Sequence, residues 1–211
     1  AADGGYFARE ITPVPVRAWR EQEAAGEPPD FTQDETIRRD TTLEKLAKLK
    51  TSFRADGRVT AGNSSQISDG AAALLLMSGD AARKYGLKGL VRIRAIATVG
   101  SDPTLMLTGP IAATRRVLER AGLNLDDIDL FEVNEAFASV PLMWSRELGV
   151  GQERLNVNGG AIALGHPLGA SGARIMTTLV HELQRREVGL GLQTICCAGG
   201  LATATVLERL P

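Results

Sequence analysis

Two glycine-rich segments near the end of the chain carry the side chains best suited to acyl-transfer chemistry. The first reads GHPLGASG over residues 165–172, and the second reads CCAGG over residues 196–200. The chain has only two His and two Cys, and these segments hold His166, Cys196 and Cys197. A histidine can carry a proton, a thiol can attack or exchange one, and backbone N–H groups can stabilise an oxyanion. The two segments therefore predict an acyl-transfer site.

His166 is the first candidate for the proton carrier. Pro167 confines the backbone of the preceding residue to extended conformations, and residues 169–172 lead into a predicted helix whose N-terminus favours nearby negative charge. The alternative is a buried histidine bonded to a backbone carbonyl, with no chemical role. His181 lies in the middle of that helix beside Glu182 and is predicted to occupy a solvated face.

Several motifs, taken together, resemble the catalytic loops of the thiolases, which cleave or form 3-ketoacyl-CoA by thiolytic or Claisen chemistry. These motifs are NEAF at 134–137, GHP at 165–167 and CxAGG at 196–200. TAGNSS at 60–65 and DGAAA at 69–73 extend the likeness, in family order, over nearly the whole chain. The resemblance implies a thiolase-like α/β fold, with coenzyme A and acyl-CoA as substrates and no permanently bound cofactor.

The hydrophobic pattern divides the chain near residue 65. Residues 1–65 are polar and irregular and are expected to be the end of the loop domain that covers the thiolase cleft. Residues 66–211 are expected to form the C-terminal core domain, the second of two similar halves. Alternating strands and helices there predict a mixed, mostly parallel five-stranded sheet with helices on both faces. Expected strands are 72–78, 91–99, 128–133, 155–157, 190–196 and 201–207, and expected helices are 110–121, 135–148 and 171–186.

The resemblance also implies a role for each candidate side chain. His166 would activate a nucleophilic cysteine and donate a hydrogen bond to the thioester oxygen. Cys196 would move the α-proton of the acetyl group, and Asn134 would fix a water that completes an oxyanion hole. The alternatives are an inert core thiol for Cys196 and a helix N-cap for Asn134.

The choice between the two cysteines depends on register. The thiolase pattern has a Glu some twelve residues after the cysteine, and Glu208 satisfies this spacing for Cys196. Successive strand residues point to opposite faces, so only one thiol can look into the cleft. Cys197 is therefore assigned to packing. Ala198 is expected to supply an oxyanion N–H, provided that its φ is ordinary.

Coenzyme A contacts follow from the same resemblance. Ser65 matches a position that touches the pantetheine arm, and Arg38 matches a basic residue near the adenine nucleotide. Ala136 and Phe137 are expected beside the pantetheine tunnel. The alternatives are a plain turn for Ser65, a solvated charge for Arg38 and core packing for Phe137. No metal site is expected, because two His and two adjacent Cys make a poor ligand set.

Composition limits the partners and the setting. Of the 211 residues, 44% are hydrophobic and 23% charged, and the net charge of −1 predicts no general attraction to nucleic acid. No apolar run approaches the roughly 20 residues that a membrane span needs. Adjacent cysteines make no disulfide framework, which suits a reducing, cytoplasmic setting. A homodimer or homotetramer is expected from the resemblance.

The chain begins without Met and thiolases are about twice its length, so it is expected to be the C-terminal half of one. The nucleophilic Cys would then lie in the missing N-terminal half, and this chain alone would be inactive. LATA at 201–204 looks more like degradative thiolases of fatty-acid or steroid side-chain β-oxidation than biosynthetic ones. The alternative is a non-catalytic thiolase-like protein that binds acyl-CoA or lipid. The β-ketoacyl synthases share the fold class but generally lack the cysteine at 196.

Overall fold

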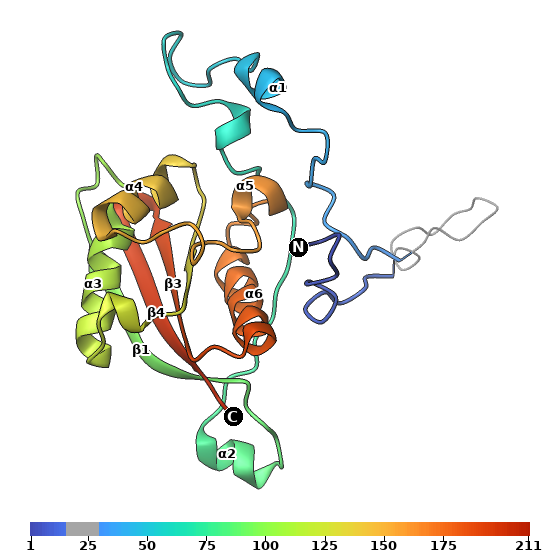
Figure 1. The fold of residues 1–211 in the computed structure, drawn as a ribbon, viewed down its shortest axis with the longest axis vertical. Coiled ribbons are helices and arrows are strands. Elements are labelled where there is room, and N and C mark those ends of the chain that lie inside the picture. The colour runs from blue at the N-terminus through green and yellow to red at the C-terminus, as the bar shows by residue number, and fades with distance from the viewer. Residues whose placement is uncertain (16–29) are drawn as a thin grey trace, which may run out of the picture.

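The computed structural model describes residues 1–15 and 30–211, which form a layered α/β structure (Figure 1). Its sheet has four strands in the order β1-β4-β3-β2. Strand β4 runs antiparallel to both β1 and β3, whereas β2 runs parallel to β3. The strands are β1 (Val91–Gly100), β2 (Leu130–Val133), β3 (Leu190–Cys197) and β4 (Leu201–Arg209).

The α/β class and the mixed sheet are confirmed, but the expectation of five mostly parallel strands is wrong in detail. Two of the three strand pairs are antiparallel, because the turn at 198–200 reverses the chain and β1 then joins the free edge of β4. The expected strand 155–157 is reduced to one bridge between Leu155 and Phe131. Asn156 ends it, since its φ of 46° is incompatible with extended backbone.

Helices cover both faces of the sheet, as predicted (Figure 1). Helix α3 (Gly109–Ala121) and helix α4 (Ser139–Leu148) pack on one face, and α6 (Ser171–Arg186) packs on the other. Pro110 near the start of α3 and left-handed Gly122 after its end explain the accuracy of its predicted bounds. The shorter helices are α1 (Leu43–Ala47), α2 (Gly79–Lys84), α5 (Ala161–Leu164), η2 (Ala61–Asn63), η3 (Leu125–Asp127) and η4 (Ala198–Gly200).

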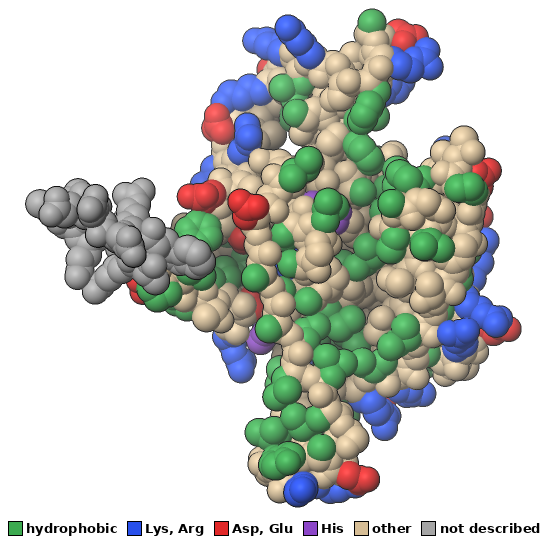
Figure 2. Space-filling view, turned by 180° about the vertical axis from the view of Figure 1, so that it is seen from behind, with side chains coloured by type: hydrophobic (Ala, Val, Ile, Leu, Met, Phe, Trp, Pro, Cys, Tyr) green, Lys and Arg blue, Asp and Glu red, His purple; other side chains and the backbone are tan. Residues whose placement is uncertain are grey.

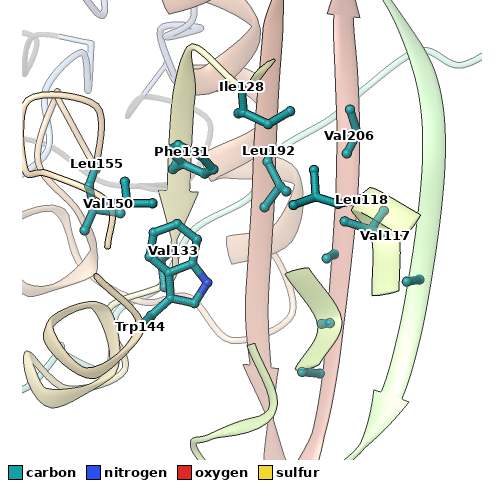
Figure 3. Close-up of a cluster of buried hydrophobic side chains, with 14 of the residues drawn as sticks. Val117, Leu118, Ile128, Phe131, Val133, Trp144, Val150, Leu155, Leu192 and Val206 are labelled. Atoms are coloured by element: carbon teal, nitrogen blue, oxygen red, sulfur yellow. The ribbon is translucent and has the colours of Figure 1, made fainter. Parts of the chain in front are cut away.

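Strand alternation divides the core into two clusters. Phe131 and Val133 face α3 and α4, where the Phe131 ring lies 5.1 Å from that of Trp144 (Figure 3). Leu130 faces α6 and packs with Leu179. Each fully buried side chain of this size stabilises the fold by about 1.5–3 kcal/mol relative to exposure. The α6 face also buries a carboxylate, Glu132, which is 4% exposed.

The expected strand 72–78 does not form. No strand among residues 1–15 and 30–211 pairs with it, and its apolar side chains are left open to solvent. Leu75 is 82% and Leu76 62% exposed, and Ile67, earlier in the same stretch of chain, is 94% exposed. Hydrophobic side chains gather along this side of the molecule (Figure 2). An apolar stretch of this kind normally marks an interaction surface.

None of the helices in residues 1–15 and 30–211 combines the length and apolarity needed to cross a membrane.

Candidate active site

One segment, residues 63–67, joins the two loops that carry the predicted catalytic side chains; its first residue, Asn63, ends η2, and the chain then runs through bridges at Ser64 and Ile67. At one end, the backbone N–H and the hydroxyl of Ser65 both donate to the carbonyl of Ala136, each at 3.1 Å. At the other end, the backbone N–H of His166 donates to the carbonyl of Gln66 at 2.8 Å. The loop after β2 and the loop before α6 are therefore fixed to one piece of backbone.

The imidazole of His166 is held by the first residue of α6. Its Nδ1 lies 2.6 Å from the Oγ of Ser171, and that hydroxyl also donates to the carbonyl of Pro167 at 3.1 Å. A hydroxyl has one proton, so Nδ1–H must be the donor to Ser171 when Pro167 is the acceptor. This assigns the lone pair to Nε2, which is the tautomer that a general base needs.

Burial shifts the pKa values of the two candidate proton carriers in opposite directions. The pKa of His166 is lowered, mainly by burial and secondly by the positive charge of Arg174. The pKa of Cys196 is raised, mainly by burial. Near pH 7 the histidine is therefore neutral and able to accept a proton, while the thiol is protonated and able to donate one.

Asn134 is buried with an uncommitted amide. Its side chain is 2% exposed, and neither Oδ1 nor Nδ2 has a hydrogen-bond partner among residues 1–15 and 30–211. Its backbone N–H donates to the carbonyl of Thr194 at 3.0 Å, which extends the β2–β3 ladder by one residue. A buried unpaired polar group costs about 1–3 kcal/mol, so this amide is a candidate to meet a ligand or a water.

The expected helix from 135 and the N-cap alternative for Asn134 are both wrong. Helix α4 begins at Ser139, because residues 136–138 are bonded to the segment around Ser65. Phe137 forms an antiparallel bridge with Ser64, which extended backbone can make and helical backbone cannot.

Two polar side chains that the sequence reasoning missed hold the end of β2. The amide of Asn156 accepts from the N–H of Val133 at 2.8 Å and donates to its carbonyl at 2.9 Å. The carboxylate of Glu135 accepts from the N–H of Ile162 at 3.1 Å, near the start of α5. A Cβ at Gly160 would lie 2.3 Å from that carboxylate, so a larger residue there would displace Glu135 from its bond to Ile162. The NxNGG run at 156–160 was the available signal.

The two cysteines lie on opposite faces of β3, as alternation predicted. Cys196 pairs with Ala202 and packs against the core cluster under α3 and α4, whereas Cys197 pairs with Leu201. Glu208 lies six residues beyond Ala202, about 20 Å along the strand. There it forms ion pairs with arginines of β1. Glu208 thus served only to choose between the two cysteines in the sequence pattern, and it lies too far along the strand to belong to the site.

The turn after Cys197 has the backbone that the oxyanion prediction needs. Ala198 is not among the non-glycine residues with positive φ. Its φ is therefore ordinary, as the prediction of an oxyanion N–H at this residue required. Gly200 has a φ of 82°, and a Cβ there would lie 2.6 Å from the carbonyl of Ser101. Glycine is therefore obligatory at 200 but not at 198.

The predicted coenzyme A contacts are only partly grouped. Ser65 lies at the junction of the two catalytic loops, and the Phe137 ring meets that of Phe53 edge-on at 6.2 Å. Arg38 lies in an exposed turn, where its carbonyl accepts from the hydroxyl of Thr41 at 2.8 Å. No group of three potential metal ligands occurs in the part of the chain that the structure describes.

His181 is half-buried, so its predicted solvated face is wrong. Residues 5–10 of the N-terminal segment cover this part of α6 and close a cavity of about 180 Å³ lined by His181, Tyr6 and Arg9. The pKa of His181 is lowered, mainly by this burial and then by Arg9.

Two carboxyls, Glu132, which is buried, and Glu10, which is half-buried, make the stability of the fold depend on pH. Burial raises the pKa of Glu132 to about 8 and that of Glu10 to about 7. In the folded state these groups hold protons that the unfolded chain releases above about pH 4.5. Their contribution to stability is therefore complete below pH 4.5 and is lost as the pH rises through 7 and 8.

Glu132→Gln should flatten this pH dependence, because an amide keeps the shape without a titrating proton. Between pH 5 and pH 9, the free energy of unfolding of the parent chain should fall on the order of 4 kcal/mol more than that of the variant. Urea denaturation across this range measures the difference. Glu147→Gln, which alters only an exposed ion pair with Arg115, should leave the slope unchanged. Equal slopes for Glu132→Gln and the parent would contradict the assignment.

Comparison with known proteins identifies the family. Residues 87–209 match the family model "Thiolase, C-terminal domain", and residues 1–80 match "Thiolase, N-terminal domain". The chain belongs to the thiolase family. The expectation that it is a C-terminal half alone is wrong, because residues 1–80 belong to the N-terminal family domain.

Similar thiolases carry two kinds of name. The chain is 53% identical to an acetyl-CoA acetyltransferase of Pseudomonas aeruginosa over 99% of its length, and 49% identical to a 3-ketoacyl-CoA thiolase of Erwinia tasmaniensis over all of it. It covers 52% and 54% of those proteins, about half their length.

Solved structures show the same likeness. The Bacillus anthracis acetyl-CoA acetyltransferase superposes with a TM-score of 0.93 at 44% identity. The human mitochondrial 3-ketoacyl-CoA thiolase in complex with CoA gives 0.88 at 40%. Both comparisons cover the whole of this chain; they cover 52% of the Bacillus anthracis protein and 51% of the human one.

Proposed function

We propose that this chain supplies the acid–base and oxyanion groups of a thiolase that cleaves 3-ketoacyl-CoA with coenzyme A, or runs the reverse Claisen condensation. The observation that carries the proposal is the joint placement of Asn134 and His166. Residues 63–67 fix both loops, the buried amide has no partner among the described residues, and Nε2 is the basic nitrogen. This arrangement supports an oxyanion site beside a general base.

The first half-reaction needs a thiolate in addition to these groups. Neither cysteine of the chain lies in residues 1–80, and both belong to the end of β3. We therefore assign the nucleophilic thiol to a segment outside this chain, which makes the chain alone inactive. His166 Nε2 takes the proton of that thiol, and the sulfur attacks the C3 carbonyl of the substrate.

The tetrahedral adduct then collapses. The C2–C3 bond breaks, and its electron pair leaves as the enolate of acetyl-CoA. Cys196 protonates the enolate carbon, which its raised pKa favours, because the thiol keeps its proton at neutral pH until the enolate forms. The thiol of coenzyme A then gives its proton to the Cys196 thiolate, and its sulfur attacks the acyl-enzyme thioester. The C–S bond to the nucleophilic cysteine breaks, the imidazolium of His166 returns a proton to that sulfur, and the shortened acyl-CoA is released.

Oxyanions form in both half-reactions, and the site offers donors for them. The side-chain amide of Asn134, acting through a water, and the ring of His166 serve one oxygen, while the N–H of Ala198 serves the other. Losing one such preorganised donor typically lowers the rate by about 10²–10³. Ser65, Arg38, Ala136 and Phe137 are proposed to line the coenzyme A path.

We further propose the degradative direction, on the likeness of residues 201–204 to degradative thiolases. Relatives are named either acetyl-CoA acetyltransferase or 3-ketoacyl-CoA thiolase. The test compares two substrates: the rate of thiolysis of a longer 3-ketoacyl-CoA should exceed the rate of thiolysis of acetoacetyl-CoA. We also propose residues 1–65 as cleft cover and 66–211 as the core domain; positions 16–29 of the former lie outside the described residues.

The deciding experiment is complementation. The chain is co-expressed with the half of the Pseudomonas aeruginosa relative that it does not cover, and the purified pair is assayed for acetyl-CoA release from acetoacetyl-CoA and CoA. The pair should turn over, whereas the chain alone and a pair carrying His166→Ala should not. A covalent acetyl group on either cysteine of the isolated chain, found by mass spectrometry, would contradict the proposal. A pair that co-purifies and binds acetyl-CoA without turnover would establish the non-catalytic alternative.

A further inference from the structure

A side chain takes the place of a neighbouring strand at the end of β2. The backbone of Asn156 turns away from β2, because its φ is 46°. Its side-chain amide then accepts from the N–H of Val133 at 2.8 Å and donates to the carbonyl of Val133 at 2.9 Å. Val133 directly precedes Asn134 in the chain. The amide of Asn156 therefore fixes the direction in which β2 presents Asn134.

Glu135, on the other side of Asn134, extends this contact to the start of α5. Its Oε1 accepts from the same Asn156 amide at 3.1 Å, and its Oε2 accepts from the backbone N–H of Ile162 at 3.1 Å. That N–H is one of the donors that a helix leaves unpaired in its first turn, and the residue before α5, Gly160, has no side chain to bond it. The carboxylate thus joins two segments that lie 21 and 27 residues from it in the sequence.

These bonds close a ring around the two candidate catalytic loops. On one side of the ring, residues 63–67 bind Ala136 and the backbone N–H of His166. On the other side, Glu135 binds Ile162, and α5 leads from there to His166 in four residues. A loop attached at one point can pivot about it, whereas attachment at two points also fixes its orientation. The ring therefore determines how the amide and the imidazole of the site lie relative to each other.

We propose that Glu135 and Asn156 are a positioning pair, which sets the distance and orientation of the Asn134 amide relative to the His166 imidazole. The polar atoms of both side chains are bonded to protein, so the pair acts through the two loops and not on the substrate. The inference rests on the proposed function for its effect on catalysis. Hydrogen exchange tests the ring in the chain alone, so failure of this proposal and failure of acyl transfer are distinguishable.

Backbone hydrogen exchange, followed by NMR in the ¹⁵N-labelled chain, distinguishes a ring from a local helix cap. Glu135→Ala removes the acceptor of the Ile162 N–H, so exchange at Ile162 should accelerate about tenfold or more. Because the ring acts as a unit, exchange at the N–H groups of His166 and Ser65 should also accelerate, although their own acceptors are unchanged. Glu153→Ala, which removes an exposed carboxylate from the connection between α4 and α5, should leave all three rates unchanged.

Exchanging the two side-chain groups tests the pair without truncating either residue. Asn156→Asp places two carboxylates face to face and should open the ring. Adding Glu135→Gln puts a donor opposite an acceptor again and keeps the net charge of the parent chain. Exchange at Ile162 and His166 should therefore be slower in the double variant than in Asn156→Asp. These variants keep nearly the parent side-chain size, so they decide the question if Glu135→Ala does not fold.

The co-expressed pair of the complementation experiment gives the catalytic readout. Glu135→Ala should lower kcat for thiolysis about 10²-fold and leave KM for acetoacetyl-CoA within about threefold, because misplaced reacting groups slow the chemical step without weakening uniform binding. Accelerated exchange confined to Ile162, or a double variant that exchanges no more slowly than Asn156→Asp, would overturn the proposal. An unchanged kcat in a Glu135→Ala pair that turns over would overturn it as well.

Discussion

Replacing His166 by alanine is expected to slow acylation of the assembled enzyme by at least about 10³-fold. The variant loses the base that takes the thiol proton, a contribution of about 10²–10⁴, and an oxyanion donor worth about 10²–10³. The two losses concern one residue and do not multiply cleanly. Rapid-quench measurement of acyl-enzyme formation gives the rate directly. His181→Ala is the matched control, since that ring lies under the N-terminal segment and should leave the rate unchanged.

His166→Asn separates the two roles of the imidazole. An asparagine amide can donate toward the thioester oxygen but cannot accept the thiol proton, so it should recover only part of the rate. Raising the pH should help this variant more than the parent enzyme, because solvent then generates the thiolate without the base. Near-normal acylation by His166→Ala at neutral pH would mean that the histidine is structural and that the proposed mechanism is wrong.

Much of the fold follows from local signals that tertiary contacts did not override. Helix α6 has an apolar stripe at helical spacing, and its predicted range of 171–186 is the observed one. β3 and β4 are likewise close to prediction, because the glycines at 199 and 200 mark the turn between them. The ends of these elements can be predicted because the residues that fix them lie within or next to the elements themselves.

The errors occur where a distant segment decides the local structure. NEAF at 134–137 has no helix breaker, yet it stays outside the helix because Ser65, 71 residues away, binds Ala136. The apolar run 72–78 has strand composition but no pairing strand among the described residues. The residues within each segment do not show whether a distant segment will bind it, so a prediction from local pattern assigns both 134–137 and 72–78 wrongly.

The candidate site shows the same division. His166, Asn134 and Cys196 were predictable from residue type and motif. Ser171 as the partner of Nδ1, and Gln66 as the backbone acceptor, were not, because a serine in GASG and a glutamine in a polar segment have many ordinary roles. Their importance comes from geometry: a hydroxyl five residues along the chain meets the imidazole of His166, and a carbonyl a hundred residues away accepts from its backbone N–H.

Cys196→Ala is expected to nearly abolish turnover while leaving acylation possible. The proposed role of this thiol is to protonate the departing enolate, a step that follows attack on the carbonyl. Its buried position in the apolar layer under α3 and α4 raises its pKa and keeps it an acid until the enolate develops. Incubation with an acyl-CoA should therefore still label the nucleophile, and the loss should appear in exchange of the acetyl α-proton with deuterated solvent.

Cys197→Ala is the matched comparison, one residue along the same strand. Its side chain lies on the opposite face of β3, so its loss should cost little beyond packing and leave exchange of the α-proton intact. Cys196→Ser adds a further discrimination, because a hydroxyl of similar size is a much weaker acid than a thiol and should not restore the exchange. Equal losses at the two positions, or the larger loss at Cys197, would show that the other face of the strand looks into the site. The assignment of the catalytic thiol to Cys196, made from its spacing to Glu208, would then be wrong by one residue.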